Sequence, residues 1–313
     1  MKTKRIIDRL QAFWFAPAPA ERLAILRIGT GGFALWYLLS RFSMLRRMAR
    51  GGEAHFEAIG LVAELGGPIP PLAFDAVLYI LIGLNLLYIL GWKFKYIGPL
   101  FATLLLLFLT YRNSWAMIYH NRNALVLQVL IIGWTTAADA FSLDALRSRT
   151  LKGIHWRYGL PIKLICVATV CTYFVSGVAK VAGDLSWEWA TGEALRSQVA
   201  VDAIRKVLLG GELEPVFMWI YPYTWVFMVM GITTLILELG APFALWKKRL
   251  TWVWVVLTWL MHWGIFFVMG IRFRYQMTGL IFLAFFDTEK VWFGLKQWYS
   301  KNVQRSNRTL SSY

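Results

Sequence analysis

Charged residues are scarce in this sequence, and acidic residues are the scarcest. Only 16% of the 313 residues are charged, and 17 acidic residues stand against 33 basic ones. About a quarter of the residues in a soluble domain are charged, so this deficit excludes an ordinary soluble fold. The chain is instead 58% hydrophobic and holds 17 tryptophans. This composition predicts an all-α fold, a polytopic helical bundle integral to a membrane.

Cysteine and histidine are also rare, which excludes two kinds of site. The two cysteines, Cys166 and Cys171, lie close together within one apolar run, a placement that does not suit a disulfide. The four histidines lie far apart along the chain, at positions 55, 120, 155 and 262. No His/Cys spacing typical of a zinc site occurs, so the sequence predicts a protein without a bound metal.

The basic residues are numerous enough to raise the question of a polyanionic partner, because the formal net charge is +16. They lie mostly in short segments between apolar runs. That placement is typical of topology signals and of contact with anionic lipids. We therefore expect membrane lipids as partners and no binding of nucleic acid.

Eight apolar runs are candidate membrane spans. They cover residues 22–42, 72–91, 96–117, 123–138, 159–180, 222–246, 251–270 and 274–287. The fourth and eighth runs are shorter than the roughly 20 residues that a spanning helix needs. Lys and Arg are commoner in the termini and in the loops on the same side as the termini. Both termini are therefore predicted to be cytoplasmic, in a bacterial inner (plasma) membrane.

This scheme divides the chain into three parts. Residues 1–20 are predicted to form an amphipathic segment on the cytoplasmic face, residues 21–290 the transmembrane domain, and residues 291–313 a basic cytoplasmic tail. Two external loops are longer than hairpins. The loop at 43–71 is predicted to hold a short helix. The loop at 181–221 is predicted to hold an interfacial helix at Ala194–Leu209.

Two charged residues lie inside predicted spans, where charge is costly. Arg27 lies in the first turns of the first run, and Glu238 lies deep in the sixth. The predicted topology puts both toward the cytoplasmic half of the membrane. We therefore expect them to form a structural ion pair, and a part in proton movement stays open.

Another set of polar residues is expected toward the external face. Lys180 ends the fifth run, just after the small residues Ser176 and Gly177, which let a neighbouring helix approach. His120 lies in the turn before the fourth run, and His262 lies within the seventh. If these three side chains converge in an apolar pocket, desolvation favours a neutral lysine that can act as a base. The alternative is that Lys180 extends to the lipid headgroups and that the histidines are structural.

Five stretches carry a resemblance to one family. They are Leu23–Gly29, Ser114–Trp115, His120–Asn121, Ala137–Asp144 and Tyr173–Lys180. Together they resemble the HTTM domain, the membrane domain of vitamin K-dependent γ-carboxylase and of its bacterial relatives. The resemblance extends over nearly the whole chain.

The resemblance implies a chemistry for this set of residues. In the family's animal enzyme a lysine deprotonates reduced vitamin K, and O2 and CO2 then take part in the carboxylation of glutamate. Lys180 matches that lysine, His120 and His262 match histidines of the family, and Glu238 matches an acidic residue. The implied function is a γ-glutamyl carboxylase-like or oxygenase-type enzyme. It would use a reduced quinone of the vitamin K or menaquinol type, with a lysine base at the external face.

Two other functions stay open, because similarity carries a fold more reliably than an activity. One is a non-catalytic partner that assembles or matures a secreted peptide or a larger membrane complex. The other is a carrier of lipids or of other small hydrophobic molecules. A region around Lys180 that is filled by side chains would disfavour both the enzyme and the carrier.

Overall fold

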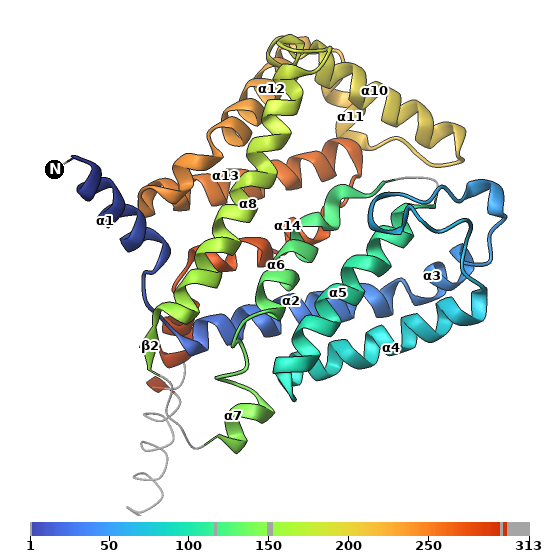
Figure 1. Ribbon diagram of the computed structural model, residues 1–313. Helices are drawn as coiled ribbons and strands as arrows, with labels where there is room; N and C mark the ends of the chain where they lie inside the picture. Colours follow the sequence, from blue (N-terminus) through green and yellow to red (C-terminus); the bar gives the residue numbers. More distant parts are fainter. Residues whose placement is uncertain (1, 116–117, 149–152, 295–296, 299–313) are drawn as a thin grey trace, which may run out of the picture. The chain divides into compact units, whose positions relative to one another are not determined.

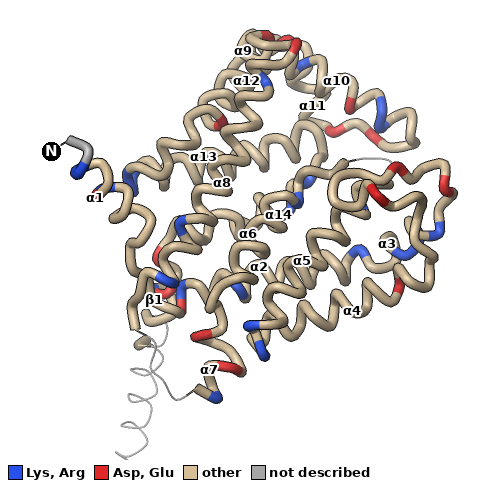
Figure 2. The backbone as a smooth tube through the Cα atoms, viewed as in Figure 1, with Lys and Arg blue, Asp and Glu red and all other residues tan. Residues whose placement is uncertain are grey.

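The computed structural model describes residues 2–115, 118–148, 153–294 and 297–298, and they are almost entirely helical (Figure 1). The predicted all-α class is therefore confirmed. Two strands of two residues each, β1 (Ala18–Pro19) and β2 (Ile154–His155), pair antiparallel. Charged residues lie mostly near helix ends and in connections, as Figure 2 shows. This distribution is that of a membrane protein, whose long helices are apolar along their length.

Among the described residues, five helices are long and apolar enough to cross a membrane. They are α2 (Ala20–Ser40), α4 (Pro71–Leu90), α5 (Phe94–Asn113), α8 (Trp156–Ala182) and α13 (Lys248–Met269). Each of the five coincides with a predicted span to within a few residues. Their length and hydropathy are properties that a single sequence displays directly.

The predicted count of eight spans is not confirmed. The other three runs form α6 (Asn123–Gly133), α12 (Thr224–Leu239) with η4 (Ala241–Leu245), and α14 (Arg274–Met277) with η5 (Leu280–Phe285). Pro242 lies in the 3-10 turn that follows α12, and Gly279 adopts φ +75° between α14 and η5. Both residues interrupt an α-helix without lowering the hydropathy of the run.

The helices form two compact units, and the boundary between the units lies within α8. In the first unit, residues 1–165 and 283–313, α2 contacts α4 and α6, and α5 also contacts both (Figure 1). Gly98 of α5 and Gly133 of α6 face each other. A Cβ at Gly98 would lie 2.5 Å from the Gly133 carbonyl oxygen. Glycine at both positions lets the two helix backbones touch, as is common between membrane helices.

Shorter elements complete the first unit. They are α1 (Lys2–Trp14), α3 (Phe42–Met48), η1 (Glu53–His55), η2 (Gly60–Val62), η3 (His120–Arg122) and α7 (Leu143–Arg147). The predicted amphipathic N-terminal segment is thus a helix over most of its length. Near the start of α2, Arg22 forms ion pairs with Asp287 and Glu289, each at 2.5–2.7 Å. These pairs fasten the C-terminal part of the chain to the first span.

The second unit, residues 166–282, holds the rest of α8 and the elements that follow it. Besides α12, α13 and α14 these are α9 (Glu188–Thr191), α10 (Glu193–Leu208) and α11 (Pro215–Ile220). The helix predicted at 194–209 is therefore present. Gly192 and Gly231 let α9 and α12 pack backbone against backbone, because a Cβ at either would collide with the other segment's main chain.

One long-range contact fixes the start of α5. The Asp144 carboxylate accepts hydrogen bonds from the backbone N–H groups of Lys93 at 2.9 Å and Phe94 at 2.8 Å. The first N–H groups of a helix have no partner within the helix. A carboxylate there satisfies two of them and also interacts favourably with the helix dipole.

We therefore expect Asp144→Ala to lower the free energy of unfolding by about 1–2 kcal/mol, because the loss of a helix cap costs that much. The measurement is unfolding of the purified chain in mixed micelles with increasing SDS, followed by tryptophan fluorescence. Asp184→Ala removes an exposed loop aspartate and serves as the control. Equal stability of the two variants would contradict a capping role for Asp144.

Candidate functional site

Four residues of α8 lie on one face of the helix. Tyr173 lies three and four residues before Ser176 and Gly177, and Lys180 lies four and three residues after them, which places the four on one side of the helix. Tyr173 and Gly177 are buried, whereas Ser176 and Lys180 are partly exposed. This face meets α12 in the second unit. It includes Lys180, which the sequence predicts to be a base.

Lys180 is bound by an acidic residue. Its ammonium group donates to both carboxylate oxygens of Glu238, at 2.7 and 2.6 Å, and to the Ser176 hydroxyl at 3.1 Å. The Ser176 hydroxyl in turn donates to Glu238 at 3.2 Å. The Lys180 amine also lies 5.3 Å from the centre of the Trp189 ring. An ammonium group has three N–H donors, so these partners occupy all of them.

Gly177 makes the contact between the two helices possible. A Cβ at this position would lie 2.9 Å from the Glu238 Cβ and 3.0 Å from the backbone nitrogen of Leu239. Without that Cβ the two backbones come close enough for a lysine one turn away to reach Glu238. The spacing predicted that a neighbouring helix approaches here, and the structure identifies that helix as α12.

The predicted partner of Glu238 was wrong, since the structure pairs this residue with Lys180. The sequence placed Glu238 in the cytoplasmic half and Lys180 at the external end, on the assumption that residues 222–246 cross the membrane in full. The helix α12 has only 16 residues, and its first half packs on α9 around Gly192 and Gly231. Its last turn, at Glu238 and Leu239, lies against Gly177 of α8.

Arg27, the other half of the predicted pair, is fully buried within the first unit. Its guanidinium donates to the Phe141 carbonyl oxygen and lies 5.7 Å from the centre of the Phe94 ring. Two of its nitrogens, Nε and Nη1, have no hydrogen-bond partner among the described residues. Arg27 thus holds the 134–144 segment against the turn between α4 and α5.

The amine of Lys180 is not free in the structure, because Lys180 donates to both carboxylate oxygens of Glu238. Its side chain is 18% exposed, and that of Glu238 is 8% exposed. The amine therefore has one exposed edge, and Glu238 lies behind it.

His262 lies in the aromatic core of the second unit. It is 4% exposed, and its Nδ1 atom lies 2.8 Å from the Thr258 carbonyl oxygen. Its ring packs edge-on against Tyr173 at 5.8 Å and against Phe273 at 5.3 Å. A histidine bonded to its own helix and enclosed by rings has the environment of a structural residue.

Tyr173 links this core to the Lys180 face of α8. Its ring also contacts Trp254 at 5.3 Å and Phe282 at 6.3 Å. Its buried hydroxyl has no hydrogen-bond partner among the described residues. The sequence did not single out Tyr173 as a site residue, although it shares the helical face of Ser176 and Lys180.

His120 belongs to the first unit, where it begins η3 and is exposed. Lys180 and His262 both belong to the second unit. The convergence of the three residues therefore stays a prediction. Within the second unit, Lys180 is joined directly to Ser176, Glu238 and Trp189, and His262 is joined to Tyr173.

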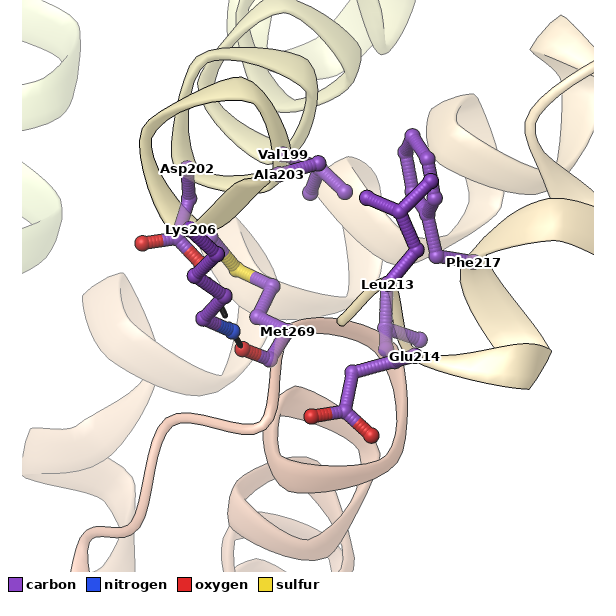
Figure 3. Close-up of a pocket in the computed structure, with 9 residues that line it drawn as sticks. Val199, Asp202, Ala203, Lys206, Leu213, Glu214, Phe217 and Met269 are labelled. Carbon is purple, nitrogen blue, oxygen red and sulfur yellow. Dashed lines mark hydrogen bonds and ion pairs between the residues drawn. The ribbon is translucent and has the colours of Figure 1, made fainter. Parts of the chain in front are cut away.

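A small cavity lies elsewhere in the second unit, between α10, the start of α11 and the end of α13 (Figure 3). It has room for about one water molecule. Lys206 reaches across it to the Met269 carbonyl oxygen and pairs with Asp202 at 3.0 Å. A lysine at a helix C-terminus satisfies an unpaired carbonyl and the helix dipole. Lys206 thus caps the C-terminus of α13, and the cavity lies beside this cap.

The described residues contain no group of three or more His, Cys, Asp or Glu side chains placed to hold a metal ion. The chemistry available at the candidate site is that of an amine, a carboxylate and a hydroxyl. These groups hold and move protons.

Comparison of the chain with protein-family models, with curated proteins and with solved structures finds no match. The resemblance to the HTTM domain therefore stays a prediction from the sequence motifs.

We expect Gly177→Ala to destabilise the second unit by about 1–2 kcal/mol, because the added Cβ forces α8 and α12 apart. Alanine has a higher helix propensity than glycine, so propensity alone would make the variant more stable. A loss of stability therefore indicates a packing clash. The control is Gly83→Ala in α4, where an added Cβ meets no atom within 4 Å. SDS unfolding measures both variants, and a Gly177→Ala protein as stable as the control would contradict close packing.

The ion pair can be tested by a double-mutant cycle. Lys180→Met leaves a buried carboxylate unpaired, and we expect a loss of about 3 kcal/mol. Glu238→Leu costs less, since the lysine can turn its amine toward the exposed edge. The double variant recovers most of the loss because no unpaired charge remains. Losses that simply add in the double variant would show that the two side chains do not interact.

Proposed function

We propose that this chain is an integral membrane enzyme that uses Lys180 and Glu238 as a proton-transfer pair on a hydrophobic quinol. The observation that carries the proposal is the Lys180–Glu238 contact within apolar helices. Ionisable residues inside membrane helices are costly and commonly mark proton pathways or substrate sites. The resemblance to the HTTM family supplies the substrate class.

The pair provides two linked proton transfers. Lys180 releases one ammonium proton to the Glu238 carboxylate, which leaves a neutral amine and a carboxylic acid. The amine then takes the proton of a quinol hydroxyl and becomes an ammonium again. The quinol is left as its anion, and the net result is one proton moved from the quinol to Glu238. Ser176 holds both partners in place, because it accepts from Lys180 and donates to Glu238.

The surroundings of Lys180 suit a flat, lipid-soluble ring. The partly exposed amine lies 5.3 Å from the centre of the Trp189 ring, against which a quinol ring can stack. Phe174 and Val178, on the adjacent face of α8, are both exposed apolar side chains. A quinol that diffuses within the lipid can reach the amine along this side of the helix.

The resemblance supports a wider reaction. In the family that the sequence resembles, reduced vitamin K and O2 supply the strong base for glutamate carboxylation with CO2. The part proposed for this chain's own residues is the initial deprotonation by Lys180, with Glu238 as the proton acceptor. His262, enclosed by Tyr173 and Phe273, is proposed to position Tyr173 and not to contact the quinol.

We propose a bacterial inner membrane as the location, with both termini cytoplasmic and Lys180 toward the external face. The distribution of Lys and Arg between the apolar runs supports this orientation. Anionic lipids are then the expected partners of the basic segments. This orientation also places the amine on the side where the animal enzyme of the family works.

A second candidate function is a non-catalytic partner that assembles or matures a secreted peptide or a larger membrane complex. One observation favours it: all three N–H donors of Lys180 are occupied within the protein. A fully satisfied ion pair needs no substrate to explain it. The two candidates differ in whether the amine must lose its proton.

The test is oxidation of the quinol by O2 in the presence of the purified chain in liposomes, followed by the absorbance of the quinone. Lys180→Met and Glu238→Gln are each expected to slow turnover at least 100-fold, the usual effect of removing a general base. Gln keeps the hydrogen bonds of Glu238 but cannot take a proton. Lys163→Met, on the same helix, is the control and should leave the rate unchanged.

Normal quinol oxidation by a folded Lys180→Met protein would end the enzymatic proposal. A wild-type chain that oxidises no quinol, but is isolated in mild detergent with a peptide or another membrane protein, would establish the second candidate. Isolation of the chain alone would argue against that candidate.

A further inference from the structure

Two arginines and two tyrosines form a stacked cluster in the first unit, outside the proposed proton-transfer pair. The Arg112 guanidinium lies 3.7 Å from the centre of the Tyr119 ring. Arg122 lies 4.3 Å from the centre of the Tyr37 ring and 5.8 Å from that of Tyr119. The four residues come from the end of α5, from the segment around η3 and from α2. Three separate parts of the chain thus build one cluster.

The cluster carries positive charge and has no acidic partner among the described residues. Arg112 is only 6% exposed, and its recorded hydrogen bond is to the neutral Asn113 side chain at 3.3 Å. Neither Arg112 nor Arg122 forms an ion pair in the part of the chain that the structure describes. A contact with an aromatic ring is weaker than the cost of taking a guanidinium out of water. The stacking alone therefore does not balance the charge.

Other arginines of the same unit show the usual solution. Arg46 and Arg50 converge on the Asp75 carboxylate, at 2.8 and 2.6 Å. These two arginine side chains are each 39% exposed, so they need a counter-charge less than the buried Arg112 does. Among the described residues, the more exposed Arg46 and Arg50 thus have a carboxylate partner, and the more buried Arg112 has none.

Three polar atoms of the cluster and of the adjacent Asn121 are buried and have no hydrogen-bond partner among the described residues. They are Arg122 Nη1, the Tyr37 hydroxyl and Asn121 Oδ1. Two of the three are donors, and buried donors are almost always satisfied in native proteins. Burial, and to a lesser degree the like charges of Arg112 and Arg41, lower the pKa of Arg122 to about 10. A bound anion would accept hydrogen bonds from the unpartnered donors and would also balance the positive charge.

We infer that this cluster is a binding site for an oxyanion, a phosphate or carboxylate group held by Arg112, Arg122 and the Tyr37 hydroxyl. A guanidinium presents its N–H groups as a planar fork that matches two oxygens of such a group. The rings of Tyr37 and Tyr119 hold the forks in place. The oxyanion can belong to a lipid headgroup or to a soluble molecule, and the chemistry of recognition is the same.

The experiment measures thermal unfolding of the full chain in maltoside micelles by tryptophan fluorescence. One arm adds inorganic phosphate against sodium chloride at equal ionic strength. The other adds phosphatidylglycerol against diacylglycerol, which has the same tails and no phosphate. A ligand that binds the folded state raises the unfolding midpoint by an amount that grows with the logarithm of its concentration relative to its dissociation constant. The concentration dependence in each arm therefore yields an apparent affinity.

Arg122→Gln is expected to weaken the apparent affinity about tenfold or more, as the loss of a charged hydrogen-bond donor does. Arg47→Gln removes the same charge from an exposed position and should leave the affinity unchanged. Tyr37→Phe removes only the unpartnered hydroxyl. It should weaken binding a few-fold without lowering the midpoint measured in the absence of ligand.

Stabilisation by phosphatidylglycerol alone identifies a lipid headgroup as the ligand, and stabilisation by phosphate identifies a soluble oxyanion. If Arg122→Gln does not fold, Arg122→Lys and Tyr37→Phe give the comparison instead. The inference is overturned if neither probe raises the midpoint beyond its matched control. It is equally overturned if the cluster variants bind as tightly as Arg47→Gln.

Discussion

The attraction between Lys180 and Glu238 governs the arrangement of the second unit. Neither side chain can stay charged between apolar helices unless the other lies within hydrogen-bond distance. That requirement fixes the position of α12 along α8, because the last turns of both helices must meet. It also requires a glycine at position 177, where any side chain would separate the backbones. Ser176 and Trp189 also contact the amine, which keeps one exposed edge.

The sequence predicted the all-α class and the five long helices, because length and hydropathy are local properties that a lipid environment enforces. The predicted count of eight spans is not confirmed, since the helices near Gly279 and Pro242 end within runs that stay apolar. Lys180 could be singled out as an unusual charge at the end of an apolar run. Its partner could not, because hydropathy gives no tertiary contacts and the assumed full crossing by residues 222–246 put Glu238 at the wrong depth.

The chain balances its buried cations in different ways, and the differences separate structural from functional candidates. Lys180 is matched by a carboxylate, and Arg27 by a backbone carbonyl and an aromatic ring. Arg112 and Arg122 have aromatic rings and no acidic partner among the described residues. The first arrangement can exchange a proton within the protein, and the second is structural. The positive charge of Arg112 and Arg122 is the one that we propose to bind an oxyanion.

The order in which the two members of the ion pair are synthesised has a consequence for biogenesis. Glu238 follows Lys180 by 58 residues, so the ribosome delivers the amine to the membrane well before its carboxylate exists. During that interval α8 can hold its charged end only at the lipid–water boundary. Burial of the amine must await the arrival of α12. The packing of α8 against α12 is therefore necessarily a late step in the synthesis of this unit.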